Sequence, residues 1–410
     1  MAMSSRSPLI NLKKSKDTLF LIAFAVYGIW SLLLQTFFAA RWPLASLENK
    51  VFFACLFLLG VREIIFCMRH QNGWCDFVLL LVFGAMARIA GYFGHPFGMI
   101  FVFVFCARKI DFKRVAKTAL MISAGVLLGT ILAQHMGWIH TVQTVRDGQI
   151  RQYLGFLYVL TPSVIFFNIV ALHVYLRRIN ISWGELIALA AINVWFYTKT
   201  NARLSMILIA VLLCYAIVIK CRPAVQKKMI QNKLGVLWPF SFVLGAVMTA
   251  AVTRFYSVGQ ANWQRLNLAI GNRLWYGQAA FKTYGVKPFG QTIAWVGNGL
   301  QASGKPVAGI YNYVDNFYLH YLLNFGFIFS ILLIAVVTIA LWVMLCKGEG
   351  CLLMIFALLA CHGLIDDMIL YPYFNTFLLI LSPYLLLGLR ALRICMKRQR
   401  RARSEKEASA

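Results

Sequence analysis

An acid and an amide, Asp315 and Asn316, stand directly before a long apolar run in the C-terminal third of the 410-residue chain. A charged side chain at the mouth of a membrane helix is costly unless a partner or a substrate uses it. A carboxylate at such a partly dehydrated position could accept the proton of a hydroxyl nucleophile. Asp315 could instead cap the following helix, because an acid interacts favourably with the positive end of the helix dipole. The residues leave both interpretations of Asp315 open.

Several arginines from segments far apart in the sequence are expected at the same face of the protein. They are Arg151, Arg203, Arg254, Arg265 and Arg273. Guanidinium groups bind phosphate through paired hydrogen bonds, and a diphosphate needs more than one of them. The cluster therefore predicts a lipid that carries a diphosphate. Arg254 could equally mark the membrane interface and Arg265 could be solvated, whereas the polar neighbours of Arg203 and the aromatic neighbours of Arg273 favour a function.

Other candidate residues give weaker signals. The adjacent acids Asp366 and Asp367 could ligate a divalent cation, but they lack further oxygen ligands nearby, and we expect no metal ion and no cofactor. His320 follows Asp315 by about one and a half helical turns, and a histidine at such a position is more often packed than catalytic. The ten cysteines show neither a disulfide framework nor a metal-binding spacing with histidine.

The composition indicates which kind of structural elements position these residues. The chain is 61% hydrophobic and 13% charged, with a mean hydropathy of +0.73. These values exclude an ordinary soluble domain and predict an all-α polytopic membrane protein. Apolar runs recur along almost the whole length, so we treat residues 1–410 as a single membrane domain. The first run, 18–40, is too long for the core of a signal peptide and is read as a retained span.

Apolar periodicity and loop charge predict about twelve transmembrane helices, the fourth short enough to be re-entrant. They are expected at 18–40, 50–67, 76–91, 96–107, 116–136, 154–176, 182–198, 203–220, 234–253, 316–346, 350–366 and 374–394. Two longer segments separate them, 137–153 and a large outer loop at 254–315. Aromatic residues throughout the second favour an ordered structure over a disordered one.

The formal net charge of +27 results from 40 Lys and Arg against 13 Asp and Glu. Of the basic residues, 27 lie in segments that fall on one side of the predicted membrane. The positive-inside rule assigns that side, with both termini, to the cytoplasm. The basic tail 397–410 is interpreted as an anchor at the membrane surface and not as a nucleic-acid arm. We expect a multi-pass protein of a bacterial cytoplasmic membrane, with no nucleic-acid partner.

Three of these segments resemble the bacterial family of O-antigen ligases and Wzy-type polysaccharide polymerases, over roughly 146–390. The stretch Arg151-Gln-Tyr-Leu-Gly-Phe156 with Pro162 is similar to the family's arginine, Gly-Phe and proline at the start of a mid-chain span. Asn201-Ala-Arg203 is similar to its arginine at a helix entrance. Gly271-Asn-Arg273 through Pro288-Phe-Gly290 resembles its outer-loop arginine, aromatic-rich helix and Pro-Phe-Gly turn.

The acid and amide described first also belong to this resemblance. Family ligases have His-Asn or a similar pair, then nine residues and a glycine, and Asp315-Asn316 followed by nine residues and Gly326 keeps that spacing. Aspartate replaces the histidine here, as in looser polymerase relatives. His320 does not occupy the matching position, so the identity of the base stays open.

The resemblance implies a GT-C-like membrane glycosyltransferase that is a polysaccharide polymerase. It would join repeat units of O-antigen, capsule or exopolysaccharide en bloc at the outer face of the membrane, with undecaprenyl-diphosphate-linked oligosaccharide as both donor and acceptor. It implies catalytic roles for Asp315, Arg203 and Arg273, with substrate contacts from Arg151, Asn316, Arg254 and His320. A chain-length regulator and a flippase would be its protein partners.

Three alternatives are weighed against a polymerase. A ligase would differ mainly in its acceptor. A lipid-linked oligosaccharide flippase or another transporter could also use arginines for a diphosphate, but it should line a central path with them and would be expected to show paired broken helices. An O-acetyltransferase would need a nucleophile and a histidine in an arrangement that the sequence does not show.

Overall fold

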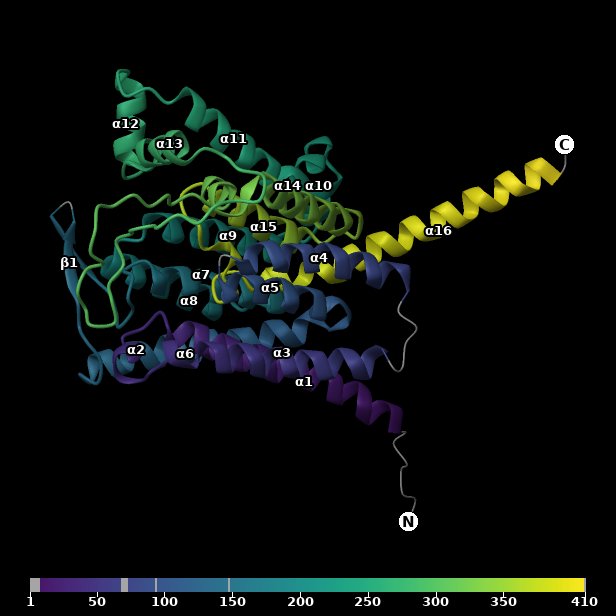
Figure 1. Cartoon of the computed structure of the whole chain (residues 1–410), viewed down its shortest axis with the longest axis horizontal. Coiled ribbons are helices and arrows are strands. Elements are labelled where there is room, and N and C mark those ends of the chain that lie inside the picture. Colours follow the sequence, from purple (N-terminus) through teal and green to yellow (C-terminus); the bar gives the residue numbers. More distant parts are fainter. Residues whose placement is uncertain (1–7, 68–72, 93, 147, 409–410) are drawn as a thin grey trace, which may run out of the picture.

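The computed structural model describes residues 8–67, 73–92, 94–146 and 148–408. Its long helices run side by side, which gives the molecule two ends (Figure 1). α1 (Pro8–Leu33) begins and α16 (Leu381–Ala408) finishes at one of them, the terminal end. A hairpin of β1 (Gln143–Arg146) and β2 (Gln149–Gln152) lies at the other, the hairpin end, together with α12 (Ala261–Ala269) and α13 (Arg273–Tyr284).

Seven helical segments of the described chain are long and apolar enough to cross a membrane. They are α4 (Trp74–Tyr92), α6 (Phe112–His135), α7 (Thr161–Arg177) extended to Asn180, α9 (Arg203–Cys221), Lys233–Phe255 with α11 (Ser241–Phe255), α14 (Phe317–Cys346) and Thr376–Cys395, which includes the start of α16. Two shorter apolar helices are Asp17–Leu33 within α1 and α15 (Gly350–His362). Large apolar side chains such as Phe57, Met121 and Ile331 are exposed, as contact with lipid requires. The protein is therefore helical and embedded in a membrane, as its composition predicts.

The number of about twelve spans stays a prediction, because several helices do not meet the length or polarity of a span. The remaining elements are α2 (Phe38–Arg41), α3 (Glu48–Cys67), α5 (His95–Cys106), α8 (Trp183–Thr200), α10 (Ala224–Gln231) and short 3-10 helices at Ala45–Leu47, Ala107–Lys109, Arg178–Asn180, Lys233–Phe240, Met368–Leu370 and Thr376–Ile380. α5 has 12 residues, about 18 Å of helix, whereas the hydrocarbon core is about 30 Å thick. α3 carries four charged residues, which makes it a poor span.

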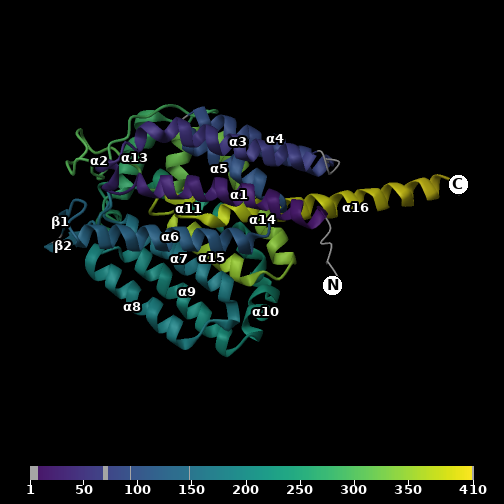
Figure 2. The ribbon, with the colours of Figure 1, turned by 90° about the horizontal axis from the view of Figure 1, so that it is seen from below.

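The helices pack in layers around α7. Nearly every residue of α7 is buried, because α6 covers one side of it and α8 and α9 cover another (Figure 2). α14 packs against α4, α11, α15 and α16, and joins the same apolar core. The core is rich in phenylalanine, with edge-on pairs such as Phe101 with Phe329. This rigid centre fixes the ends of the helices that carry the predicted site residues.

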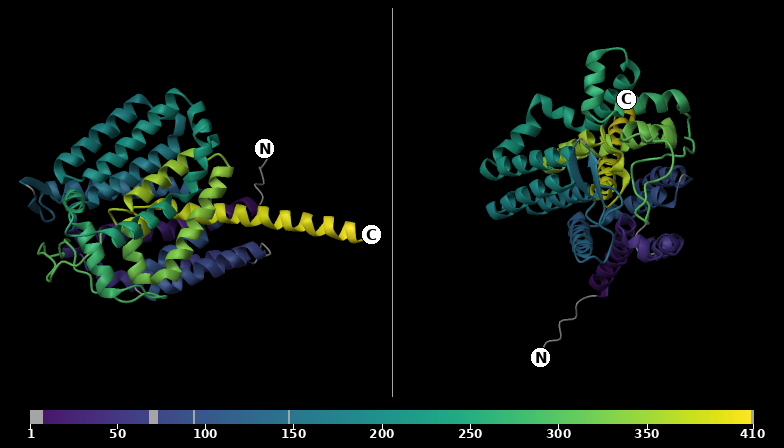
Figure 3. Two further views of the ribbon diagram at one scale, coloured as in Figure 1. Left: turned by 90° about the horizontal axis from the view of Figure 1, so that it is seen from above. Right: turned by 90° about the vertical axis from the view of Figure 1, so that its left-hand side faces the viewer.

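Several helix boundaries differ from those expected; for example, the run expected at 18–40 ends as a helix at Leu33, and the run expected at 350–366 ends at His362. Two further differences bear on the site and on the basic tail. The helix expected from residue 154 begins at Thr161, because Leu154 and Gly155 have positive φ (51° and 84°) and form a turn that Pro162 follows. The helix expected to end at 394 continues to Ala408 and projects beyond the bundle (Figure 3). The described part of the basic tail is therefore a continuation of α16.

The large segment expected as an outer loop is ordered. It contains α12 and α13 and then an extended stretch that runs to the start of α14. The segment expected at 137–153 contains the β-hairpin, in which Thr144 pairs with Arg151. Both segments lie at the hairpin end, so that end carries most of the non-helical backbone (Figure 1).

The extended stretch is anchored in a break of α14 at Gly326. Gly326 has φ 84° and ψ 172°, which interrupts the helix. The freed amides of Phe327 and Ile328 donate to the carbonyls of Lys287 and Pro288, both at 3.2 Å. A Cβ on Gly326 would overlap the backbone of the stretch around Pro288. Two motifs of the family resemblance, Pro-Phe-Gly and the glycine after Asp-Asn, therefore contact each other directly.

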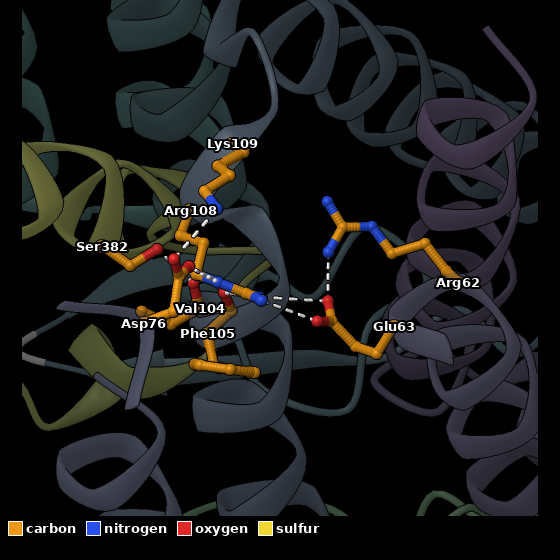
Figure 4. A network of polar contacts seen from close by, with 8 residues as sticks. All are labelled: Arg62, Glu63, Asp76, Val104, Phe105, Arg108, Lys109 and Ser382. Atoms are coloured by element: carbon orange, nitrogen blue, oxygen red, sulfur yellow. Dashed lines mark hydrogen bonds and ion pairs between the residues drawn. The ribbon is translucent and has the colours of Figure 1, made fainter. Parts of the chain in front are cut away.

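A group of charged side chains is buried at the terminal end (Figure 4). Arg108 donates to Glu63 Oε2 at 2.7 Å and to Asp76 Oδ1 at 2.8 Å, and Lys109 donates to Asp76 Oδ2 at 3.0 Å. Arg62 also pairs with Glu63. These five residues, the Arg108 network, join α3, α4 and the turn after α5, and they place each cation against an acid.

Candidate active site

Three of the predicted arginines line one cavity of about 350 Å³ at the hairpin end, the arginine cavity. Arg151 comes from β2, Arg203 is the first residue of α9, and Arg273 is the first residue of α13. The sequence predicted their convergence from segments more than 50 residues apart. Three guanidinium groups around one cavity favour an anionic ligand with several oxygen atoms.

Similar local structures present Arg203 and Arg273. Arg203 lies two residues after Asn201 (φ 51°) and Arg273 lies directly after Asn272 (φ 63°); both asparagines have left-handed backbone, and both arginines open a helix. Asparagine tolerates this conformation better than most residues. Both arginines therefore stand at a helix N-terminus, the end of a helix that carries positive potential.

The arginines differ in how firmly they are held. Arg151 is buried, and its Nε donates to the Thr200 carbonyl at 2.7 Å, at the end of α8. The Nη1 of Arg273 donates to the Ile270 carbonyl at 2.8 Å. Arg203 is exposed and is the arginine most free to follow a ligand.

His362 lines the same cavity, although it was not among the site residues predicted from the sequence. It ends α15 and is 1% exposed, yet neither ring nitrogen has a hydrogen-bond partner among the described residues. A buried polar group without a partner is costly, and it is common where a ligand supplies the partner. The residue lies one helical turn before Asp366, but a histidine inside an apolar helix gave no reason to single it out.

Asp315 lies at the wall beside this cavity. Its Oδ2 is 3.2 Å from Arg273 Nη2 and accepts a hydrogen bond from the Tyr311 hydroxyl, also at 3.2 Å. Asn316 caps α14: its Oδ1 accepts from the Leu319 amide at 2.9 Å, and its Nδ2 donates to the Leu364 carbonyl at 2.9 Å. The capping role considered for Asp315 therefore belongs to Asn316.

The two adjacent acids lie close by and are buried. Asp366 Oδ1 accepts from the Met368 amide at 3.0 Å, and Asp367 Oδ2 accepts from the Tyr313 hydroxyl at 2.6 Å. Burial and the neighbouring Asp367 and Asp315 carboxylates raise the pKa of Asp366 well above its usual range. Burial also raises the pKa of Asp367, although the hydrogen bond from Tyr313 opposes that shift. A carboxyl group with a raised pKa suits proton transfer near neutral pH.

A second cavity, of about 300 Å³, lies on the other side of these acids and is called the aromatic cavity. Its lining includes Asp315, Asp366 and Asp367, and the aromatic residues Tyr158, Trp295, Tyr311, Tyr313, Tyr371 and Tyr373. Asp366 lines both cavities, and the pair of Arg273 with Asp315 joins the two linings. Burial and the nearby acids raise the pKa of Tyr158, Tyr311 and Tyr313, so these hydroxyls stay protonated.

Three other predicted site residues lie outside both cavities. Arg254 and Arg265 are exposed, on α11 and α12. His320 is buried between Trp295 and Tyr313, with each pair of ring centroids 5.1 Å apart, and its Nε2 is 3.8 Å from Asp367 Oδ2. His320 therefore packs against two residues that line the aromatic cavity but does not line it itself.

Within the described residues, no group of three or more His, Cys, Asp or Glu side chains is arranged to hold a metal ion. No family model, curated protein or solved structure matches the chain. The arrangement itself therefore carries the functional argument: a cationic cavity with an apolar border, and an acidic cavity with aromatic walls, that meet at Asp366.

Proposed function

We propose that the protein is a polysaccharide polymerase with a lipid-diphosphate donor, a GT-C-like glycosyltransferase of a bacterial cytoplasmic membrane. The observation that carries the proposal is the meeting of the arginine cavity and the aromatic cavity at Asp366. The charge asymmetry of the loops supports an orientation with the hairpin end outside and both termini in the cytoplasm.

The arginine cavity suits an amphiphilic anion. Besides the arginines, its lining includes Ile207 of α9 and Leu268 of α12, which are 57% and 69% exposed. An isoprenoid chain can lie against these residues in the membrane while the attached diphosphate reaches Arg151, Arg203 and Arg273. The unpartnered nitrogens of His362 offer further contacts for the diphosphate or its sugar.

In the transfer step, a hydroxyl oxygen of the acceptor attacks the anomeric carbon of the donor sugar. The bond from that carbon to the diphosphate oxygen breaks, and the lipid diphosphate leaves with the electron pair. The arginines stabilise the charge that develops on it. We assign the hydroxyl proton to Asp366 in its ionised form, because this residue borders both cavities. Asp315, tied to Arg273 and Tyr311, orients the acceptor.

The distribution of charge favours an enzyme over a flippase. Both cavities lie at the hairpin end, whereas the charged residues of the Arg108 network at the terminal end are paired with one another. A flippase would need a charged path between the two ends. A ligase fits the same geometry and differs in the acceptor that enters the aromatic cavity.

The test uses purified full-length protein and undecaprenyl-diphosphate-linked repeat units as the sole substrate. A ladder of longer glycans is expected, and Arg203→Ala should abolish it. Arg254→Ala, at an exposed arginine outside both cavities, is the matched control and should keep the ladder. A ladder that persists in both Arg203→Ala and Arg273→Ala would overturn the proposal. Transfer that occurs only when a different acceptor is supplied would identify a ligase.

A further inference from the structure

The aromatic cavity has the properties of a carbohydrate site. The rings of Tyr371 and Tyr373 lie 5.4 Å apart with an angle of 34° between their planes, and Trp295 lies 6.0 Å from Tyr313. Saccharide rings have C–H faces that pack on aromatic planes and hydroxyls that bond to polar groups at the edges. An aromatic lining with a few polar groups is also typical of small-ligand sites.

One buried hydroxyl in this cavity lacks a partner. Thr161 begins α7 and is 1% exposed, and its Oγ1 has no hydrogen bond within the described part of the chain. Its side chain belongs to the lining of the aromatic cavity. Leaving such a group unsatisfied costs stability, and a ligand hydroxyl would remove that cost. This observation is independent of the acids and points to a ligand with hydroxyl groups.

The charge of the lining restricts that ligand. Three acids contribute to the lining, and no lysine, arginine or histidine of the described chain does. Arg273 pairs with Asp315 from the arginine cavity, and its Nη2 lies 3.2 Å from that acid. An anionic group placed in the aromatic cavity would find no cation in the described lining and would lie beside the carboxylate of Asp315, which is unfavourable. An ammonium group would find acids around it.

We infer that the aromatic cavity binds the accepting sugar of a lipid-linked repeat unit, and that this sugar is uncharged or carries an amino group, to the exclusion of uronic acids and other anionic sugars. The role of this sugar as the acceptor rests on the proposed function, whereas the binding of a sugar in the cavity does not. The two cavities then separate their ligands by charge, with the anionic leaving group on one side of Asp366 and the hydroxyl nucleophile on the other.

Direct binding of simple glycosides to the purified full-length protein tests this inference. The probes are methyl glycosides of a hexose, a 2-amino-2-deoxyhexose and a hexuronic acid, each in gluco and galacto configuration, followed by saturation-transfer NMR and titration. We expect a neutral or amino glycoside to bind at least about tenfold more tightly than the uronate, since the carboxylate of the uronate would lie beside acids of the lining. Equal or tighter binding of the uronate, or binding of no probe, overturns the inference.

Variants locate the binding in the cavity. Thr161→Val keeps the shape of the side chain and should weaken binding about five- to tenfold through the lost hydroxyl. Trp295→Ala should weaken it further, and Asp367→Asn should narrow the gap between uronate and neutral sugar. Trp138→Ala, at a 59% exposed tryptophan outside both cavities, is the control. Unchanged binding in both Thr161→Val and Trp295→Ala would place the sugar elsewhere and overturn the inference.

One further variant separates this inference from the proposed function. Arg203→Ala should keep the binding of free glycosides while it loses the glycan ladder. Sugar binding without any ladder in the wild-type protein would contradict the polymerase alone. A ladder in the wild-type protein without sugar binding would contradict the inference alone.

Discussion

The two ends of the molecule differ in how their charged side chains are paired. In the Arg108 network, Arg108 contacts two acids at 2.7 and 2.8 Å, and Lys109 contacts one of them at 3.0 Å. At the hairpin end, Asp366 and Asp367 are buried side by side, and arginines gather around a separate cavity. Opposite charges that are brought together contribute to the folded structure, whereas like charges that are held together around cavities indicate a site that awaits a ligand.

The largest expected effect is on the transfer rate of Asp366→Asn. Removal of the carboxyl group that borders both cavities should lower the rate on the order of 10²–10⁴-fold, the usual contribution of a general base. Thermal stability should be unchanged or slightly higher, because the substitution removes a like-charge contact with Asp367. Glycan formation and thermal unfolding in the same detergent measure both quantities.

A matched substitution controls for the loss of an acid as such. Asp17→Asn removes a carboxyl group that pairs with Arg114 at 2.6 Å, outside both cavities. The transfer rate should be the same as in the wild-type protein. An Asp366→Asn variant with normal activity would assign the base to another residue, with Asp315 the next to examine.

A substitution in the Arg108 network should lower stability and leave the transfer rate unchanged, the reverse of the effect expected for Asp366→Asn. Arg108→Met leaves Glu63 and Asp76 without their shared partner, and breaking a buried ion pair costs about 3–5 kcal/mol. The free energy of unfolding should fall by that amount, with the rate per folded molecule unchanged. Arg114→Met, which breaks a more exposed pair with Asp17, should cost less than about 1 kcal/mol. A catalytic defect in folded Arg108→Met would mean that the two ends are coupled.

The pH dependence of stability should reveal the buried acids. An aspartate titrates near pH 4 in the unfolded chain, whereas burial raises the pKa of Asp367 in the folded protein. Between these two pKa values the folded state binds more protons, so the contribution of Asp367 to stability is complete at low pH and is lost as pH rises. Each unit of difference corresponds to about 1.4 kcal/mol.

The comparison that tests this is the wild-type protein against Asp367→Asn, unfolded chemically at several pH values. The stability of the wild-type protein relative to the variant should fall between about pH 4 and about pH 7, because only the wild-type protein carries the carboxyl group of Asp367. A difference that rises with pH would mean that Asp367 is stabilised in its ionised form.

The sequence predicted the arginine cavity better than the aromatic cavity. Arginines on a face that normally lacks them are conspicuous, so Arg151, Arg203 and Arg273 could be assigned to one cluster. Arg254 was expected in the same cluster, with a place at the membrane interface as an equal alternative, because the sequence does not tell which way a side chain at a helix end points. The structure places it at the exposed surface, outside both cavities.

The aromatic cavity could not be predicted, because its walls come from a stretch without periodicity. Trp295 and Tyr313 belong to the extended segment whose position depends on hydrogen bonds to the break at Gly326. Those bonds join residues about 40 apart in sequence, and no local pattern encodes them. Thr161 fell inside the helix expected at 154–176, so nothing in the sequence marked it as a residue of a cavity.

The smallest expected effect concerns Asn316, which lies beside Asp315 but serves the fold. Asn316→Ala removes the side-chain oxygen that accepts from the Leu319 amide, and the loss of a helix cap costs about 1 kcal/mol. Asn316→Asp retains the acceptor at the cap but loses the hydrogen bond that Nδ2 donates to the Leu364 carbonyl, so it should recover only part of that stability. If Asn316 contacted substrate instead, both variants would lose activity to a similar degree, because both lack the amide group, whatever their stability. Unfolding free energies and transfer rates of the two variants therefore decide whether this pair combines one catalytic and one structural residue.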